Sequence, residues 1–138
     1  QCSPESIQRY QNRISGPLLD RIDLHIDVPP LQANELQERT PSENSETVRQ
    51  RVMKAYQQQI QRQQCLNQAL SPTLLEQYAC LDDSSSKIIE MAQQRLNLSA
   101  RAYHRVLRVA RTIADLAESE IISSSHLTEA LSYRGHSA

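Results

Sequence analysis

Apolar residues recur every three or four positions through most of the chain beyond residue 45, which is the spacing of helices with one buried face. The clearest run lies in 45–67, where apolar residues stand at Val48, Val52, Tyr56 and Ile60. Serine residues stand at or near the start of each run and are suited to cap the free amides of a helix. The pattern predicts four or five helices, at about 45–67, 72–79, 86–96, 99–118 and 124–134.

One segment has a period of two instead. Apolar and polar residues alternate over 22–28, and Pro29 and Pro30 end the run, which predicts a single half-buried strand. A short helical turn is expected before it, over 18–21. Because one strand cannot satisfy its own backbone hydrogen bonds, we expect residues 1–40 to be more mobile than the helices that follow.

These elements predict a mainly α fold, a helical bundle that is preceded by a short remnant of another unit with one candidate strand. Proline, asparagine and serine are frequent between the two parts. We therefore divide the chain into a remnant at 1–30, a linker at 31–44 and a helical domain at 45–138. Six of the eight residues in 57–64 are glutamine, and we expect them at the exposed end of the first long helix.

Two blocks and the ending of the chain carry a family resemblance. The string Leu18-Leu19-Asp20-Arg21 with the alternating run after it resembles the end of the ATPase core in magnesium-chelatase-like AAA+ proteins. The block 98–111 resembles the lid helix that carries the family's second-sensor arginine, and 121–134 resembles the last lid helix. The resemblance implies that Arg21 is the arginine finger acting on a neighbouring subunit. It also implies that Arg101 contacts the phosphate of the nucleotide bound by its own subunit.

The residues of the helix 99–118 support a site at its start. At about 100° per residue, five basic side chains fall within an arc of roughly 120°. These are Arg101, His104, Arg105, Arg108 and Arg111. Arg101 lies in the first turn beside the capping serine, where free amides and a guanidinium would bind the same anion. Arg105, one turn further, is a second candidate for contact with the nucleotide. A plain solvated basic face is the alternative for the other arginines.

The parts of an ATPase that bind the phosphates and the metal are absent from the sequence. It has no Gly-x-x-x-x-Gly-Lys-Ser/Thr loop, and its two glycines are Gly16 and Gly135. Together with a first residue other than methionine, this predicts a fragment that neither binds nor hydrolyses ATP alone. ATP and magnesium are then cofactors of the full-length protein, with no cofactor bound by this chain.

The resemblance implies a motor that acts on DNA, a helicase or remodeller of the competence type, assembled as a ring oligomer, most simply a hexamer. An ATPase subunit of a magnesium-chelatase-type complex uses the same parts and stays open. A different class also stays open: a helical binding module whose Arg105, Arg108 and Arg111 hold an acidic partner or the DNA backbone. Arg21 favours the motor, since a binding module has no use for an arginine fixed before a strand.

Composition and charge limit the binding partners, the location and the metal sites that we expect for this chain. The 138 residues carry a net charge of −1, so no overall electrostatic attraction to nucleic acid is expected. Aromatic residues make up 4%, which leaves no stacking platform for single strands. No apolar run is long enough to span a membrane and no signal peptide is evident, which predicts a cytoplasmic location. Cys2 could be the last ligand of a zinc site that lies upstream, but a lone cysteine predicts no metal site in this chain.

Overall fold

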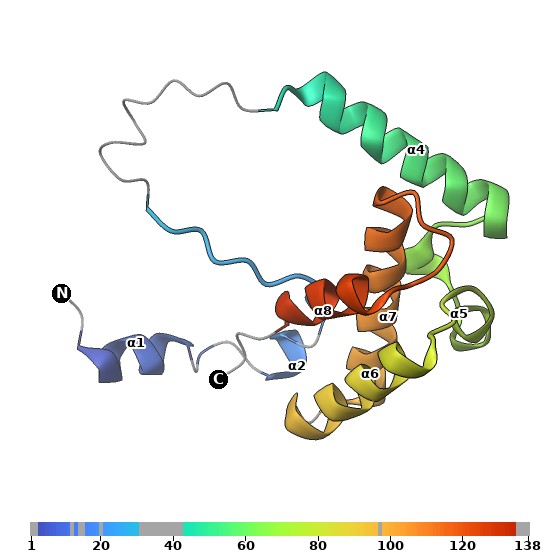
Figure 1. The fold of residues 1–138 in the computed structure, drawn as a ribbon. Coiled ribbons are helices and arrows are strands. Elements are labelled where there is room, and N and C mark those ends of the chain that lie inside the picture. The colour runs from blue at the N-terminus through green and yellow to red at the C-terminus, as the bar shows by residue number, and fades with distance from the viewer. Residues whose placement is uncertain are drawn as a thin grey trace.

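The computed structural model describes residues 3–11, 13, 16–19, 21–30, 43–96 and 98–134. The mainly α fold predicted from the sequence is confirmed, and the helices of the second part form a bundle (Figure 1). In chain order the elements are α1 (Pro4–Gln11), α2 (Gly16–Leu19), α4 (Ser45–Gln63), the 3-10 helix η1 (Asn67–Ala69), α5 (Pro72–Tyr78), α6 (Asp83–Leu96), α7 (Ala100–Leu116) and α8 (Ser124–Ser132).

Helix α7 is the centre of the bundle. It contacts α4, η1, α5 and α8, while α6 packs against α8 (Figure 1). Its buried apolar side chains are small or medium in size, which allows its neighbours to approach closely; they are Ala102, Val106, Leu107, Ala110 and Ala114. Leu75 of α5, Ile89 of α6 and Leu127 of α8 complete the core against them. This packing fixes the direction in which the polar residues of α7 point.

The helices begin where a side chain can accept a hydrogen bond from the first turn. Ser71 and Ser99 cap α5 and α7 as predicted, by accepting from the amides of Leu74 and Ala102. Helix α6 begins at Asp83, where Asp82 caps it: the Asp82 Oδ1 accepts from the Ser85 amide at 2.7 Å. The expected end of α6 at Asn97 lies outside the described residues.

Helix α4 begins at Ser45 as predicted but ends earlier than predicted. Asn44 caps it, with Oδ1 2.8 Å from the Thr47 amide. It ends at Gln63 because Gln64 adopts a left-handed conformation with φ of 59°, so the predicted continuation to residue 67 is wrong. The turn redirects the chain so that Asn67 enters the interior beside α7, where Asn67 is only 2% exposed.

The candidate strand at 22–28 forms no strand in the structure. Residues 22–30 have no regular secondary structure, and the one β-bridge among the described residues joins Leu81 and Ile122. A strand needs a partner ladder, and among the described residues this segment has a single backbone–backbone hydrogen bond to the bundle, from the His25 amide to the Tyr133 carbonyl at 2.8 Å. Its apolar residues become more exposed along the chain, from 42% at Ile22 to 85% at Val28.

Candidate functional site

Arg21 follows α2 and is available to a ligand. Its backbone amide donates to the Leu18 carbonyl at 3.0 Å, which closes the turn that the sequence predicted there. The residue is exposed, and its side chain has no hydrogen bond or ion pair within the described parts of the chain. Its guanidinium therefore keeps its planar set of donors free for phosphate or carboxylate oxygens.

Arg101 occupies the first turn of α7 and is also exposed. Ser99 caps this turn, with its Oγ 3.2 Å from the Ala102 amide. The Arg101 side chain likewise contacts no acceptor among residues 3–134 that the structure describes. The start of a 17-residue helix adds the partial positive charge of its free amides. An anion could approach this turn without displacing an internal partner.

Arg105 has a different environment, because it is already paired. Its Nη1 donates to Oδ1 of Asp23 at 2.8 Å, and the two side chains are 21% and 54% exposed. Asp23 lies two residues after Arg21, and Arg105 lies one turn after Arg101. The ion pair therefore brings together the two segments that carry the candidate arginines, although they are about 80 residues apart in the sequence.

Two further contacts join residues 22–30, called the extended segment below, to the residues at the end of α8. The His25 amide donates to the Tyr133 carbonyl, and Arg134 Nη1 lies 3.4 Å from the Ile22 carbonyl. Beside these contacts lies an open groove of about 600 Å³ between the segment and α7. Its apolar lining comes from both sides, from Leu24 and Ile26 of the segment and from Val109, Ile113 and Leu116 of α7.

The basic face predicted for α7 is not a free surface along its whole length. Arg111 is 1% exposed, so the proposal that Arg105, Arg108 and Arg111 together face a partner is wrong at this residue. Arg108 is half-buried and donates from Nη2 to the Leu70 carbonyl at 2.6 Å. The helical arc places these arginines on one side of α7 correctly, but η1 and the loop after α7 cover that side.

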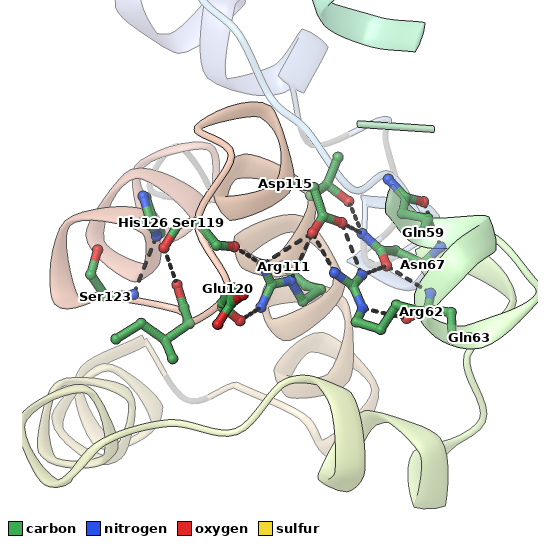
Figure 2. Close-up of polar contacts among 12 residues, drawn as sticks. Gln59, Arg62, Gln63, Asn67, Arg111, Asp115, Ser119, Glu120, Ser123 and His126 are labelled. Atoms are coloured by element: carbon green, nitrogen blue, oxygen red, sulfur yellow. Dashed lines mark hydrogen bonds and ion pairs between the residues drawn. The ribbon is translucent and has the colours of Figure 1, made fainter. Parts of the chain in front are cut away.

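A buried polar network occupies this covered side and was missed in the sequence (Figure 2). Asp115 accepts from Arg62 Nη1 at 2.6 Å, from Arg111 Nε at 3.1 Å and from Asn67 Nδ2 at 2.8 Å. Arg111 also donates to the carbonyls of Ser119 and Glu120. Burial lowers the pKa of Arg111, and the attraction of the Asp115 carboxylate opposes this shift. The network joins α4, η1, α7 and the loop that follows α7.

The glutamine-rich end of α4 takes part in the same network, so its predicted exposure is wrong at two positions. Gln59 and Gln63 are 7% and 9% exposed, and Gln59 Oε1 accepts from the Asn67 amide at 2.9 Å. The sequence held a signal for this arrangement, since Arg111 and Asp115 stand four residues apart on one helix. Arg62, 53 residues away from Asp115, gave no local signal.

The histidines and cysteines that the structure describes form no group able to hold a metal ion. No group of three or more potential ligands lies close together in the described ranges. His126 acts as a capping residue: its Nδ1 accepts from the Ser123 amide at 3.2 Å. Cys65 and Cys80 are free thiols, and Cys2 lies outside the described residues. Among the helices described, none has the length and apolar character needed to cross a membrane.

Comparison with known proteins places these features in a family. The family model for the magnesium chelatase subunit ChlI C-terminal domain matches residues 42–134, and the model for magnesium chelatase subunit ChlI matches residues 1–36. The chain is 45% identical over 134 residues to the uncharacterized protein YifB of Escherichia coli K12, and 45% identical over 133 residues to competence protein ComM of Haemophilus influenzae. The uncharacterized protein Rv2897c of Mycobacterium tuberculosis is 33% identical over 137 residues.

These matches confirm the family expected from the sequence. Each covers 96% of this chain but only 26% or 27% of the relative. The chain thus spans about a quarter of the length of the curated relatives it matches. The roles of Arg21, Arg101 and Arg105, and the domain boundaries at 30 and 44, stay predictions.

Proposed function

The chain belongs to the magnesium chelatase subunit ChlI C-terminal family, and from this premise we propose that it is the lid portion of an AAA+ ATP-dependent motor. In this proposal Arg21 is the arginine finger for a neighbouring subunit, and Arg101 is the second sensor of its own subunit. The observation that carries it is the state of these two side chains. Both are exposed without a partner in the described structure, while Arg105, Arg108 and Arg111 are engaged internally.

The chemistry of phosphoryl transfer favours this assignment. Catalysis of that reaction rests on positioned positive charge that meets the negative charge developing on the transferred group, and an arginine finger contributes several orders of magnitude in rate. Arg21 and Arg101 supply such charge from two segments joined by the Arg105–Asp23 pair. ATP and magnesium would be held by a phosphate-binding loop and acidic residues outside this chain, in a ring oligomer such as a hexamer.

The proposed substrate of the motor is DNA. One relative is named a competence protein, and we extend to this chain the corresponding role of a DNA helicase or remodeller in the cytoplasm. An ATPase subunit of a magnesium-chelatase-type complex is the second candidate, which the family description favours. The binding-module alternative is weakened, because Arg111 of its proposed face is buried.

Substitution of Arg21 in the full-length protein tests the proposal. Arg21→Ala should abolish ATP hydrolysis and leave nucleotide binding nearly intact, because a finger acts mainly in the transition state. Mixing this variant with one that lacks the phosphate-loop lysine should restore part of the activity, since some interfaces then pair an intact finger with an intact loop. Arg101→Ala should impair hydrolysis without such restoration. Parental hydrolysis by an assembled Arg21→Ala oligomer would rule out the finger assignment.

A further inference from the structure

We propose that Arg105 is a positioning residue that holds Asp23 and thereby sets the place of Arg21. Through this pair, the helix that begins with Arg101 and the segment that carries the finger move together. The inference rests on the proposed function of Arg21. It goes further by giving Arg105 a role on the finger side of the subunit boundary, in place of contact with its own subunit's nucleotide.

The short spacing on both sides of the ion pair supports this coupling. Along α7, Arg105 lies about 6 Å beyond Arg101 at a rise of 1.5 Å per residue. Along the extended segment, Asp23 lies two positions after Arg21, a stretch of at most about 7 Å. A shift of the first turns of α7 would therefore reach the backbone of Arg21 through one ion pair and a short stretch of chain.

The pair is partly buried on the Arg105 side and exposed on the Asp23 side. The Arg105 side chain is 21% exposed and the Asp23 side chain is 54% exposed, and the Nη1–Oδ1 distance is 2.8 Å. A partly buried pair is screened less than a fully exposed one. The neighbouring contacts, from the His25 amide to Tyr133 and from Arg134 to the Ile22 carbonyl, hold the backbone on either side of Asp23 against α8.

The same contacts distinguish Arg105 from Arg21 and Arg101 in how readily each can reach a phosphate. Arg105 would have to give up or share its carboxylate partner to reach a phosphate, whereas Arg21 and Arg101 would not. Removal of either member of the pair would leave Arg21 in the chain but release the ion pair that lies two residues from it. The expected defect is therefore in the rate of hydrolysis, with little change in nucleotide binding.

The test uses full-length protein carrying Arg105→Ala or Asp23→Ala. Each variant should lower kcat for ATP hydrolysis tenfold or more while the KM for ATP changes less than threefold. The double variant should be no worse than either single variant, because both changes remove the same contact. The charge exchange Asp23→Arg with Arg105→Asp should recover part of the lost rate if the pair itself matters.

Mixed oligomers decide on which side of the boundary Arg105 acts. A positioning role predicts that Arg105→Ala subunits regain activity when mixed with subunits that lack the phosphate-loop lysine, as Arg21→Ala subunits should. A contact between Arg105 and its own subunit's nucleotide predicts no recovery, and this result would overturn the inference. Matched controls are Lys54→Ala and Glu118→Ala, which break an exposed pair of 3.0 Å between other segments and should leave hydrolysis unchanged.

Failure of the inference can be told from failure of the proposed function. If Arg21→Ala abolishes hydrolysis but Arg105→Ala and Asp23→Ala keep the parental rate, the positioning role is refuted and the finger stands. If Arg21→Ala has no effect, the proposed function itself is refuted. Oligomer size and thermal unfolding are measured for every variant. A variant that does not assemble is replaced by Asp23→Asn or Arg105→Lys, for which a smaller rate loss with recovery on mixing is expected.

Discussion

Replacement of Asp115 by alanine should be among the most destabilising single changes in this domain. Asp115 is 1% exposed and accepts hydrogen bonds from Arg62, Asn67 and Arg111. Arg62, with a side chain 25% exposed, can turn to water after the change, but Arg111, with a side chain 2% exposed, cannot. Arg111 would stay buried with only backbone carbonyls as partners.

The magnitude follows from these contacts. Removal of one partner of a buried ion pair costs about 3–5 kcal/mol. A second count gives a similar cost. The change removes the hydrogen bonds that Arg111 and Asn67 donate to the Asp115 carboxylate, which water cannot replace, and each is worth about 1.5–3 kcal/mol. For a domain of this size 1 kcal/mol corresponds to about 4–8 °C, so Asp115→Ala should lower Tm by at least about 12 °C.

Thermal and urea unfolding followed by circular dichroism at the helical band measure this loss. Asp115→Asn keeps the size and one acceptor oxygen but removes the charge, and it should cost less than the alanine change. Glu118→Ala removes an exposed acid three residues away, whose partner Lys54 is also exposed, and should change stability by less than about 0.5 kcal/mol. A cost below about 1 kcal/mol for Asp115→Ala would refute the conclusion that Arg111 depends on this carboxylate.

Three further changes test other parts of the fold. Gln64→Gly should raise the free energy of unfolding by about 0.5–1 kcal/mol, because Gln64 has a φ of 59° that glycine adopts without a Cβ clash. The urea midpoint should rise accordingly, and a lowered midpoint would contradict this. The Ser85 backbone amide and the Ser84 hydroxyl lower the pKa of Asp82 below 3.8, so its contribution is present above about pH 4 and is lost as the pH falls through the folded pKa. Asp82→Ala should therefore weaken α6 at neutral pH and flatten the acid limb of the stability profile, and an unchanged acid limb would contradict the assignment. Leu127→Ala should cost about 2–5 kcal/mol by urea unfolding, since Leu127 is fully buried among α7 and α8, and a cost near zero would show that the site is not part of the core.

The sequence by itself determined most of the helices, the caps of α5 and α7, and the family. Helical spacing of apolar residues and capping side chains act over three or four residues, so they can be read without knowledge of the fold. Ser71 and Ser99 were identified in this way, and so was the turn that places Arg21 after α2. The positions of Arg21 and Arg101 came from matched motifs, which need no tertiary contact to be seen.

The tertiary structure alone decided which polar residues are free and which are used internally. Arg101, Arg105 and Arg111 lie on one side of α7 and look alike in the sequence, yet one is exposed, one pairs with Asp23 and one is buried against Asp115. Their partners lie on segments that only folding brings near. The alternating run at 22–28 predicted a strand that the structure does not form. A strand also needs a neighbouring strand to share hydrogen bonds with, and in the described structure the backbone of this run makes a single hydrogen bond to the backbone of the bundle.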